Sequence, residues 1–164
     1  MLDISEFADI EGIVTVRARS KLGIEELARL RKSDGADFVQ FFNPSAVINR
    51  VHLVGAYLNA VAAFKEKANI AKSLPIEMLL FVSMTDQIDK AIEIAGAKSK
   101  EDFLVFATSR KAFESVSGYV SELGKSAFGP GKIEIAKRYG IKNMEDLDLA
   151  VLNAMALSRI SSLE

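Results

Sequence analysis

The stretch NIAKSLPIEMLLFVSMTDQIDKAIEIAG, residues 69–96, decides which class of fold the sequence predicts. It begins with a short basic segment that ends at Pro75, and the run 76–84 that follows is almost entirely apolar. A run of this length without polar alternation favours an inner strand that is covered on both faces. The turn at Thr85 can then cap a helix over residues 86–95. The inward stripe of this helix would be Ile88, Ala91, Ile92 and Ala95.

Strand and helix patterns alternate on both sides of this stretch. Alternating or short apolar segments predict further strands over residues 12–19, 37–42 and 102–107. Helical spacing and caps predict further helices over residues 23–32, 44–67, 110–123, 133–139 and 144 to about 163. The helix from residue 44 follows the cap signal Asn43-Pro44 and is apolar almost all the way round, so a buried position is expected.

Together these segments predict an α/β protein of one domain, residues 1–164. Helices would flank a small mixed sheet of about four strands, and a helical segment would end the chain.

The composition limits the possible functions. With 164 residues, 49% of them hydrophobic, the chain can bury one ordinary core. Its 21 Lys and Arg residues nearly balance 22 Asp and Glu residues, so contact with nucleic acid would need a local basic patch. The sequence has no cysteine and one histidine, which excludes disulfides, thiolate catalysis and common zinc sites, and no cofactor is expected. The acidic N-terminus and the lack of a membrane-length apolar run predict a cytoplasmic protein.

Two residues are candidates for catalysis. His52 lies in the middle of the long apolar helix, but no carboxylate that could orient it lies nearby in the sequence. A partly buried structural histidine is therefore the preferred interpretation. Asp86 follows the predicted inner strand, where many α/β proteins bind a ligand, although an acidic residue at a helix start also stabilises the helix dipole. An enzyme with a pocket near His52 or Asp86 stays open as an alternative.

The predicted C-terminal helix carries two apolar stripes. One stripe comprises Leu147, Val151, Ala154 and Met155, and the other comprises Leu149, Leu152, Ala156, Ile160 and Leu163. A terminal helix needs only one stripe to pack on its own core. The second stripe would be exposed unless a partner or a second copy of the chain covers it, or unless the helix is central to the core. All three alternatives stay open at this point.

One edge of the molecule is expected to be basic. Lys65, Lys67 and Lys72 bracket the turn at Asn69, and Arg50 lies on the helix that leads to it. Such an edge could contact nucleic acid, and an ordinary solvated helix end explains the same charges equally well.

Several features of residues 41–98 occur together and in a fixed order. They are the Asn43-Pro44 helix start, the alanine-rich helix, the turn of residues 69–74, the segment with Glu77, and Gln87-Ile88 followed by Ala91-Ile92 and Gly96. With this combination, the segment resembles the smallest, kinase-binding subunit of the KEOPS complex, the family that includes the PRPK-binding protein of eukaryotes. The segment reads FFNPSAVINRVHLVGAYLNAVAAFKEKANIAKSLPIEMLLFVSMTDQIDKAIEIAGAK. The turn of residues 69–74 fits the archaeal type. The chain departs from that type at Asp86, where a basic residue commonly precedes the Gln-Ile pair, so any RNA contact there would be lost or reversed in sign.

The resemblance implies a non-enzymatic subunit with an α/β fold. Members of this family bind the N-terminal lobe of a small atypical kinase/ATPase subunit and support threonylcarbamoyl-adenosine synthesis on tRNA, and archaeal members hold the single-stranded CCA end of the tRNA. On this chain the kinase-binding surface would comprise Leu149, Leu152, Met155, Ala156, Arg159, Ile160 and Leu163. The tRNA-binding surface would comprise Arg50, Lys65, Asn69, Ile70 and Lys72. Without its kinase, the subunit would be able to pair with a second copy as a homodimer.

Overall fold

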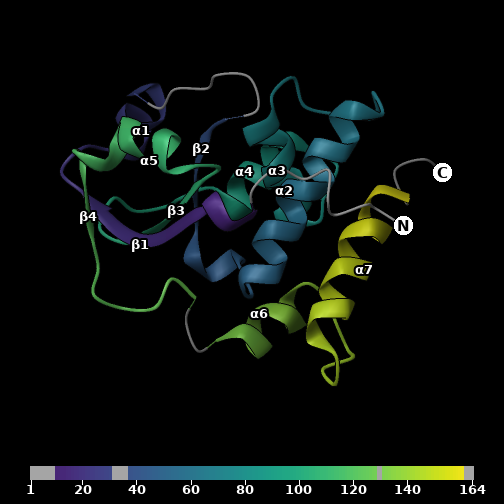
Figure 1. Ribbon diagram of the computed structural model, residues 1–164. Coiled ribbons are helices and arrows are strands. Elements are labelled where there is room, and N and C mark those ends of the chain that lie inside the picture. The colour runs from purple at the N-terminus through teal and green to yellow at the C-terminus, as the bar shows by residue number, and fades with distance from the viewer. Residues whose placement is uncertain (1–9, 31–36, 129–130, 161–164) are drawn as a thin grey trace.

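A four-stranded sheet with helices on both faces forms the centre of the protein (Figure 1). The computed structural model describes residues 10–30, 37–128 and 131–160. The strands are β1 (Val14–Ser20), β2 (Val39–Phe42), β3 (Phe103–Ala107) and β4 (Val120–Glu122), in the order β2-β3-β1-β4. The predicted α/β class and helical end are confirmed, whereas the described strand pairs are all antiparallel, so the sheet is not mixed.

The two faces of the sheet bury separate hydrophobic cores. One face packs on α2 (Arg50–Lys65), α3 (Leu74–Ser83) and α4 (Ile88–Ala95), and α6 (Lys132–Arg138) and α7 (Leu147–Ile160) extend this core. The other face packs on α1 (Ile24–Leu30) and α5 (Arg110–Ser117). Successive side chains of β1 point to opposite faces of the sheet, as the alternation at residues 12–19 of the sequence predicts, so this stretch contributes residues to both cores. A short 3₁₀ turn, η2 (Ile10–Gly12), precedes β1.

The predicted strand over residues 76–84 is wrong, because these residues lie almost entirely in the helix α3. Pro75 lies in the first turn of this helix, where its missing N–H removes no intrahelical bond. Met84 ends the helix in the left-handed conformation, with φ of 54°. α3 lies between α2, α4 and α7 and is buried on nearly all sides. A buried helix lacks polar periodicity just as a buried strand does, so the apolar run could not separate the two structures.

The chain between β2 and α2 contains two capped turns instead of the single helix start expected at residue 44. The side chain of Asn43 caps as predicted and accepts a hydrogen bond from the Ser45 N–H at 3.1 Å. This turn is a short 3₁₀ segment, η3 (Pro44–Ala46). Asn49 then caps α2, accepting a hydrogen bond from the His52 N–H at 2.9 Å.

The helix predicted over residues 110–123 is shorter than expected. α5 ends at Ser117, and Gly118 forms its C-cap. Residues 120–122 pair with β1 as the edge strand β4. The segment is too short for its alternation to outweigh the helical spacing that precedes it.

α4 is present as predicted, but its cap and its inward stripe differ from the prediction. Gln87 holds the N-cap position, so Thr85 is not the cap residue. Ala91 and Ala95 are buried, whereas Ile88 and Ile92 are exposed at the edge of the helix. Small residues allow α4 to pack closely on α3, and the larger side chains flank that contact.

Candidate functional site

The C-terminal helix α7 lies along the buried helix α2, and the two run in the same direction (Figure 1). Near the start of both helices, the Asn49 amide donates to the Asp148 carboxylate at 2.7 Å. Near their ends, a guanidinium nitrogen of Arg159 lies 3.5 Å from the carbonyl oxygen of Ala68. α7 therefore makes hydrogen bonds both to the start of α2 and to the loop that follows α2.

Gly55 allows the close approach of these helices. A Cβ atom at this position would lie 2.7 Å from Leu152 Cδ2 and 3.0 Å from Met155 Cε. Contacts of this length are too short for carbon atoms, so a larger residue would force the ends of the Leu152 and Met155 side chains to move. The close packing of α7 on α2 therefore depends on the absence of a side chain at Gly55.

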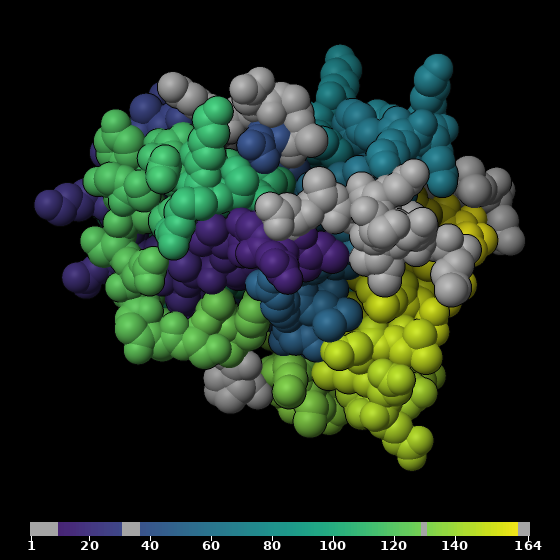
Figure 2. All heavy atoms as spheres, in the orientation of Figure 1, coloured from purple at the N-terminus to yellow at the C-terminus, as the bar shows by residue number. Residues whose placement is uncertain are grey.

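α7 has one buried face and one exposed apolar face, as its two stripes predict. Val151 and Met155 are fully buried on the inner side. The outer side exposes Leu149 by 54%, Leu152 by 37% and Ile160 by 54%, together with Ala156. This row is called the outer stripe below, and the surface of α7 is visible in yellow in Figure 2.

The predicted kinase-binding residues are only partly brought together on the outer stripe. Met155 lies in the core instead, and Leu163 lies outside the described residues. Leu157 was missed by the sequence analysis although it is 61% exposed. It flanks the outer stripe. The sequence analysis treated each face of the helix as a single row of residues, and including the neighbouring row would have identified Leu157.

Arg159 has a structural role at the end of α7. Its guanidinium lies 4.2 Å above the ring of Phe81 and binds the buried carboxylate of Glu77 at 2.5 Å. Glu77 is fully buried in the first turn of α3. These contacts join the last turn of α7 to α3, so the side chain of Arg159 faces the protein rather than a partner.

The predicted basic edge is confined to one end of α2. Lys65, Asn69, Ile70 and Lys72 lie at or just after the end of this helix, and Ile70 is 41% exposed. Arg50 begins the same helix, so roughly 22 Å of helix axis separates it from Lys65. The structure therefore places four of the five proposed RNA-binding residues together and puts Arg50 elsewhere.

His52 is a fully buried structural residue. Its Nδ1 accepts a hydrogen bond from the Ile48 N–H at 3.1 Å, which leaves Nε2 as the donor to the Val82 carbonyl at 2.9 Å. Burial lowers the pKa of His52 to about 4. The edge of Tyr139 packs against the ring, with centroids 5.5 Å apart. Both nitrogens are occupied by the backbone, so neither is available to a substrate in this arrangement.

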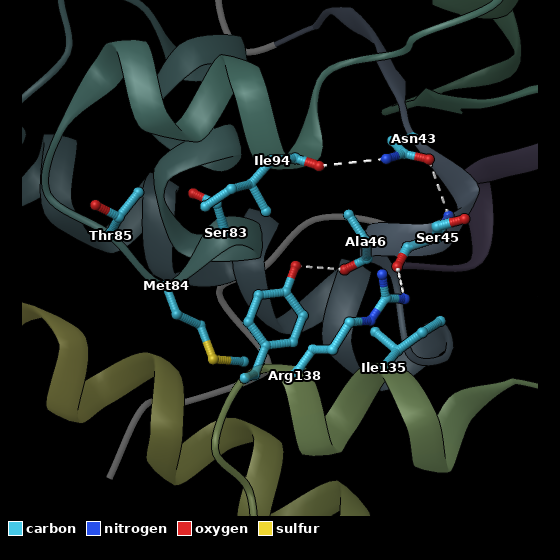
Figure 3. A pocket seen from close by; sticks show the side chains of 10 residues that line it. Asn43, Ser45, Ala46, Ser83, Met84, Thr85, Ile94, Ile135 and Arg138 are labelled. Atoms are coloured by element: carbon cyan, nitrogen blue, oxygen red, sulfur yellow. Dashed lines mark hydrogen bonds between the residues drawn. The ribbon is translucent and has the colours of Figure 1, made fainter.

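A cleft of about 530 Å³ lies beside this core, between η3, the end of α3, the end of α4 and α6 (Figure 3). Neither His52 nor Asp86 lines it. Arg138 extends into it and donates to the Ser45 carbonyl at 2.8 Å, while Tyr139 donates to the Ala46 carbonyl. Asp86 itself is exposed. The structure thus places neither of the two alternative catalytic residues in the lining of this cleft.

Within the part of the chain that the structure describes, no group of His, Asp and Glu side chains is placed so that it could hold a metal ion. None of its helices combines the length and apolarity needed to cross a membrane.

One comparison with known proteins identifies a family. No curated protein matches the chain. The model of one protein family, described as kinase binding protein CGI-121, matches residues 19–159, a range that runs from the end of β1 to the last turn of α7 and includes β2, β3 and β4. The resemblance to the kinase-binding subunit of KEOPS is thereby confirmed, and the chain belongs to the CGI-121 family of kinase-binding proteins.

Proposed function

We propose that this protein is a non-catalytic subunit of the KEOPS complex and that it binds the small atypical kinase/ATPase subunit through the outer stripe of α7. The observation that carries this proposal is the exposed apolar face of a helix whose opposite face is already fully packed. The family gives the class of partner, a kinase. The complex would support threonylcarbamoyl-adenosine synthesis on tRNA.

The outer stripe has the properties of a helix-in-groove contact. Leu149, Leu152, Ala156 and Ile160 follow each other at spacings of three and four residues, as in other amphipathic anchors. Near its middle, α7 is already packed on α2 at Gly55, so this part of the helix is formed before the partner binds. Leu149 and Ile160 are the most exposed members of this row and leave the core undisturbed when changed.

The test is the affinity for the kinase of Leu149→Glu and Ile160→Glu variants. Each change would place a charge in an apolar contact, and a loss of about 2 kcal/mol, roughly 30-fold in Kd, is expected. Ile92→Glu on α4 is the matched control, because Ile92 is similarly exposed at 47% on a different helix. Unchanged affinity of both α7 variants would reject the docking surface, as would an equal loss in the control.

A second function, binding of the tRNA CCA end, is favoured by the loop at the end of α2. Ile70 offers an exposed apolar surface on which a base could stack, and Lys65 and Lys72 offer charges for phosphates. The small size of this basic patch suits a single-stranded end better than a duplex, since the net charge of the chain is -1.

The corresponding test uses a synthetic RNA that ends in single-stranded CCA. Lys72→Glu should weaken binding and reduce the slope of log affinity against log salt concentration by about one. Lys111→Glu on α5, another exposed lysine, should leave both quantities unchanged. Equal affinity of the Lys72→Glu variant and the unaltered protein at all salt concentrations would exclude this loop as the RNA site.

Pairing of two copies through the outer stripe is the competing use of the same surface. Sedimentation of the isolated protein and of its mixture with the kinase separates the two. The proposal predicts that any homodimer gives way to a complex with the kinase, whereas a dimer that persists beside free kinase would contradict it.

A further inference from the structure

We infer that the buried pair Glu77–Arg159 positions the loop of residues 68–72, so that ligand binding at this loop depends on what occupies the end of α7. The inference rests on the proposed function, because it concerns the same two surfaces. It adds a physical connection between them.

Glu77 holds the loop and α7 with different oxygens. Its Oε2 accepts hydrogen bonds from the backbone N–H groups of Ile70 and Ala71, at 3.1 and 2.7 Å. Its Oε1 accepts from the Arg159 guanidinium at 2.5 Å. The carboxylate is fully buried, so these bonds are made where water competes little. A single side chain thus joins α3 both to the loop just before it and to α7, which is 82 residues away.

Arg159 is held in the corresponding orientation from the other side. Its guanidinium lies over the Phe81 ring, and a second nitrogen points to the Ala68 carbonyl at the start of the loop. Only 17% of its side chain is exposed. A planar guanidinium can stack on the ring and donate hydrogen bonds from two nitrogens at the same time, whereas a lysine ammonium cannot.

The loop has little other regular structure. It contains no helix or strand, and the Asn69 amide donates to the Ala71 carbonyl at 2.9 Å. The Ala68 N–H anchors the start of the loop by donating to the Ala63 carbonyl at 2.8 Å, and the hydrogen bonds to Glu77 hold its centre at Ile70 and Ala71. The exposed side chains of Ile70 and Lys72 depend on that conformation for their positions. Glu77 and Arg159 are positioning residues for this surface, and neither needs to touch the ligand.

The position of Arg159 gives the direction of the dependence. It lies in the last described turn of α7, next to Ile160 of the outer stripe. A partner that covers Ile160 stabilises this turn and keeps Arg159 on Glu77. The loop is then held more firmly, and by linkage a ligand on the loop strengthens binding of the partner.

The direct test is hydrogen exchange of the Ile70 and Ala71 amides in the isolated protein and in its complex with the kinase. Kinase binding should slow both by about fivefold or more, the lower end of typical coupling between sites. The Leu22 amide, which donates to Ser20 Oγ at 2.9 Å in a distant turn, should not change. A complex with unchanged exchange at Ile70 and Ala71 would overturn the inference alone. Absence of a complex would overturn the docking proposal and the inference with it.

A conservative variant gives a second test without the kinase. Arg159→Lys keeps the positive charge but loses the fork, so Ile70 and Ala71 should exchange severalfold faster, while Leu22 keeps its rate. Binding of the RNA ending in CCA should weaken by about fivefold. Arg138→Lys, which alters an arginine bound to the Ser45 carbonyl, is the control. Equal loop exchange in the Arg159→Lys variant and the unaltered protein would contradict the positioning role.

Discussion

At the scale of single residues, His52 is held in its neutral form by its surroundings. The ring is buried, accepts a backbone hydrogen bond with one nitrogen and donates one with the other. A protonated ring would have to break the bond from Ile48, because Nδ1 would then carry a proton. Folding therefore favours the unprotonated form of His52, which makes stability depend on pH.

The resulting prediction concerns the free energy of unfolding between pH 6.5 and about pH 5. The pKa of His52 is lowered to about 4 in the folded protein and is 6.5 without the fold, so the unfolded chain binds more protons in this window. This contribution to stability is fully present well above pH 6.5 and falls with decreasing pH, by about 2 kcal/mol at pH 5.

Urea unfolding at several pH values measures this effect. A His52→Gln variant is the control, and it should be less stable throughout but should lack this part of the pH dependence. An identical slope in the variant and in the unaltered protein would show that another group is responsible.

The sequence predicts the burial of His52 but not its partners. An apolar helical neighbourhood is enough to place the ring inside the protein. The carbonyl that accepts its proton belongs to Val82, 30 residues away, in the segment that sequence patterns assigned to a strand. Glu77 and Arg159 are 82 residues apart, and the local sequence around either residue does not indicate that the two form a pair. Contacts between distant segments need the fold before they can be inferred.

At the scale of elements, α7 was predictable because both of its faces are periodic. Spacing of three and four residues separates the inner row with Val151 from the outer row with Leu149. α3 was not predictable from its pattern, since neighbours cover it on nearly all sides and no polar face marks the helical period. Antiparallel pairing also needed the structure, because β1 pairs with β3 across the intervening helices.

Gly55 provides a prediction about how α7 packs. Gly55→Val should destabilise the protein by about 1–3 kcal/mol, because the new side chain would collide with Leu152 and Met155. Denaturant unfolding gives the change. Adding Leu152→Ala to Gly55→Val should recover part of the loss by making room for the valine.

Gly118→Val is the comparison for this change. No atom lies within 4 Å of the Cβ position of Gly118, so its stability should change by no more than about 0.5 kcal/mol. Similar losses at Gly55 and Gly118 would mean that helix propensity, rather than close packing of α7, determines the effect.

At the scale of the whole molecule, the sheet and its helices form a rigid support for two surfaces that meet at one end. α7 lies along α2, and both end near the loop that carries Ile70 and Lys72. The outer stripe is apolar and the loop is basic, so the two surfaces suit partners of different chemistry. Under the proposed function, the outer stripe would bind the kinase and the loop would bind the RNA end beside it, although the net charge of the chain is -1.

The most direct measurement is site-specific photo-crosslinking of the full chain in the presence of its kinase. A photoreactive phenylalanine analogue replaces Ile160 in one variant and Ile92 in another, since both side chains are exposed on helices. The proposed docking surface predicts kinase crosslinks from position 160, identified by mass spectrometry, and none from position 92. A kinase that crosslinks from position 92 and not from position 160, while still forming the complex, would contradict it.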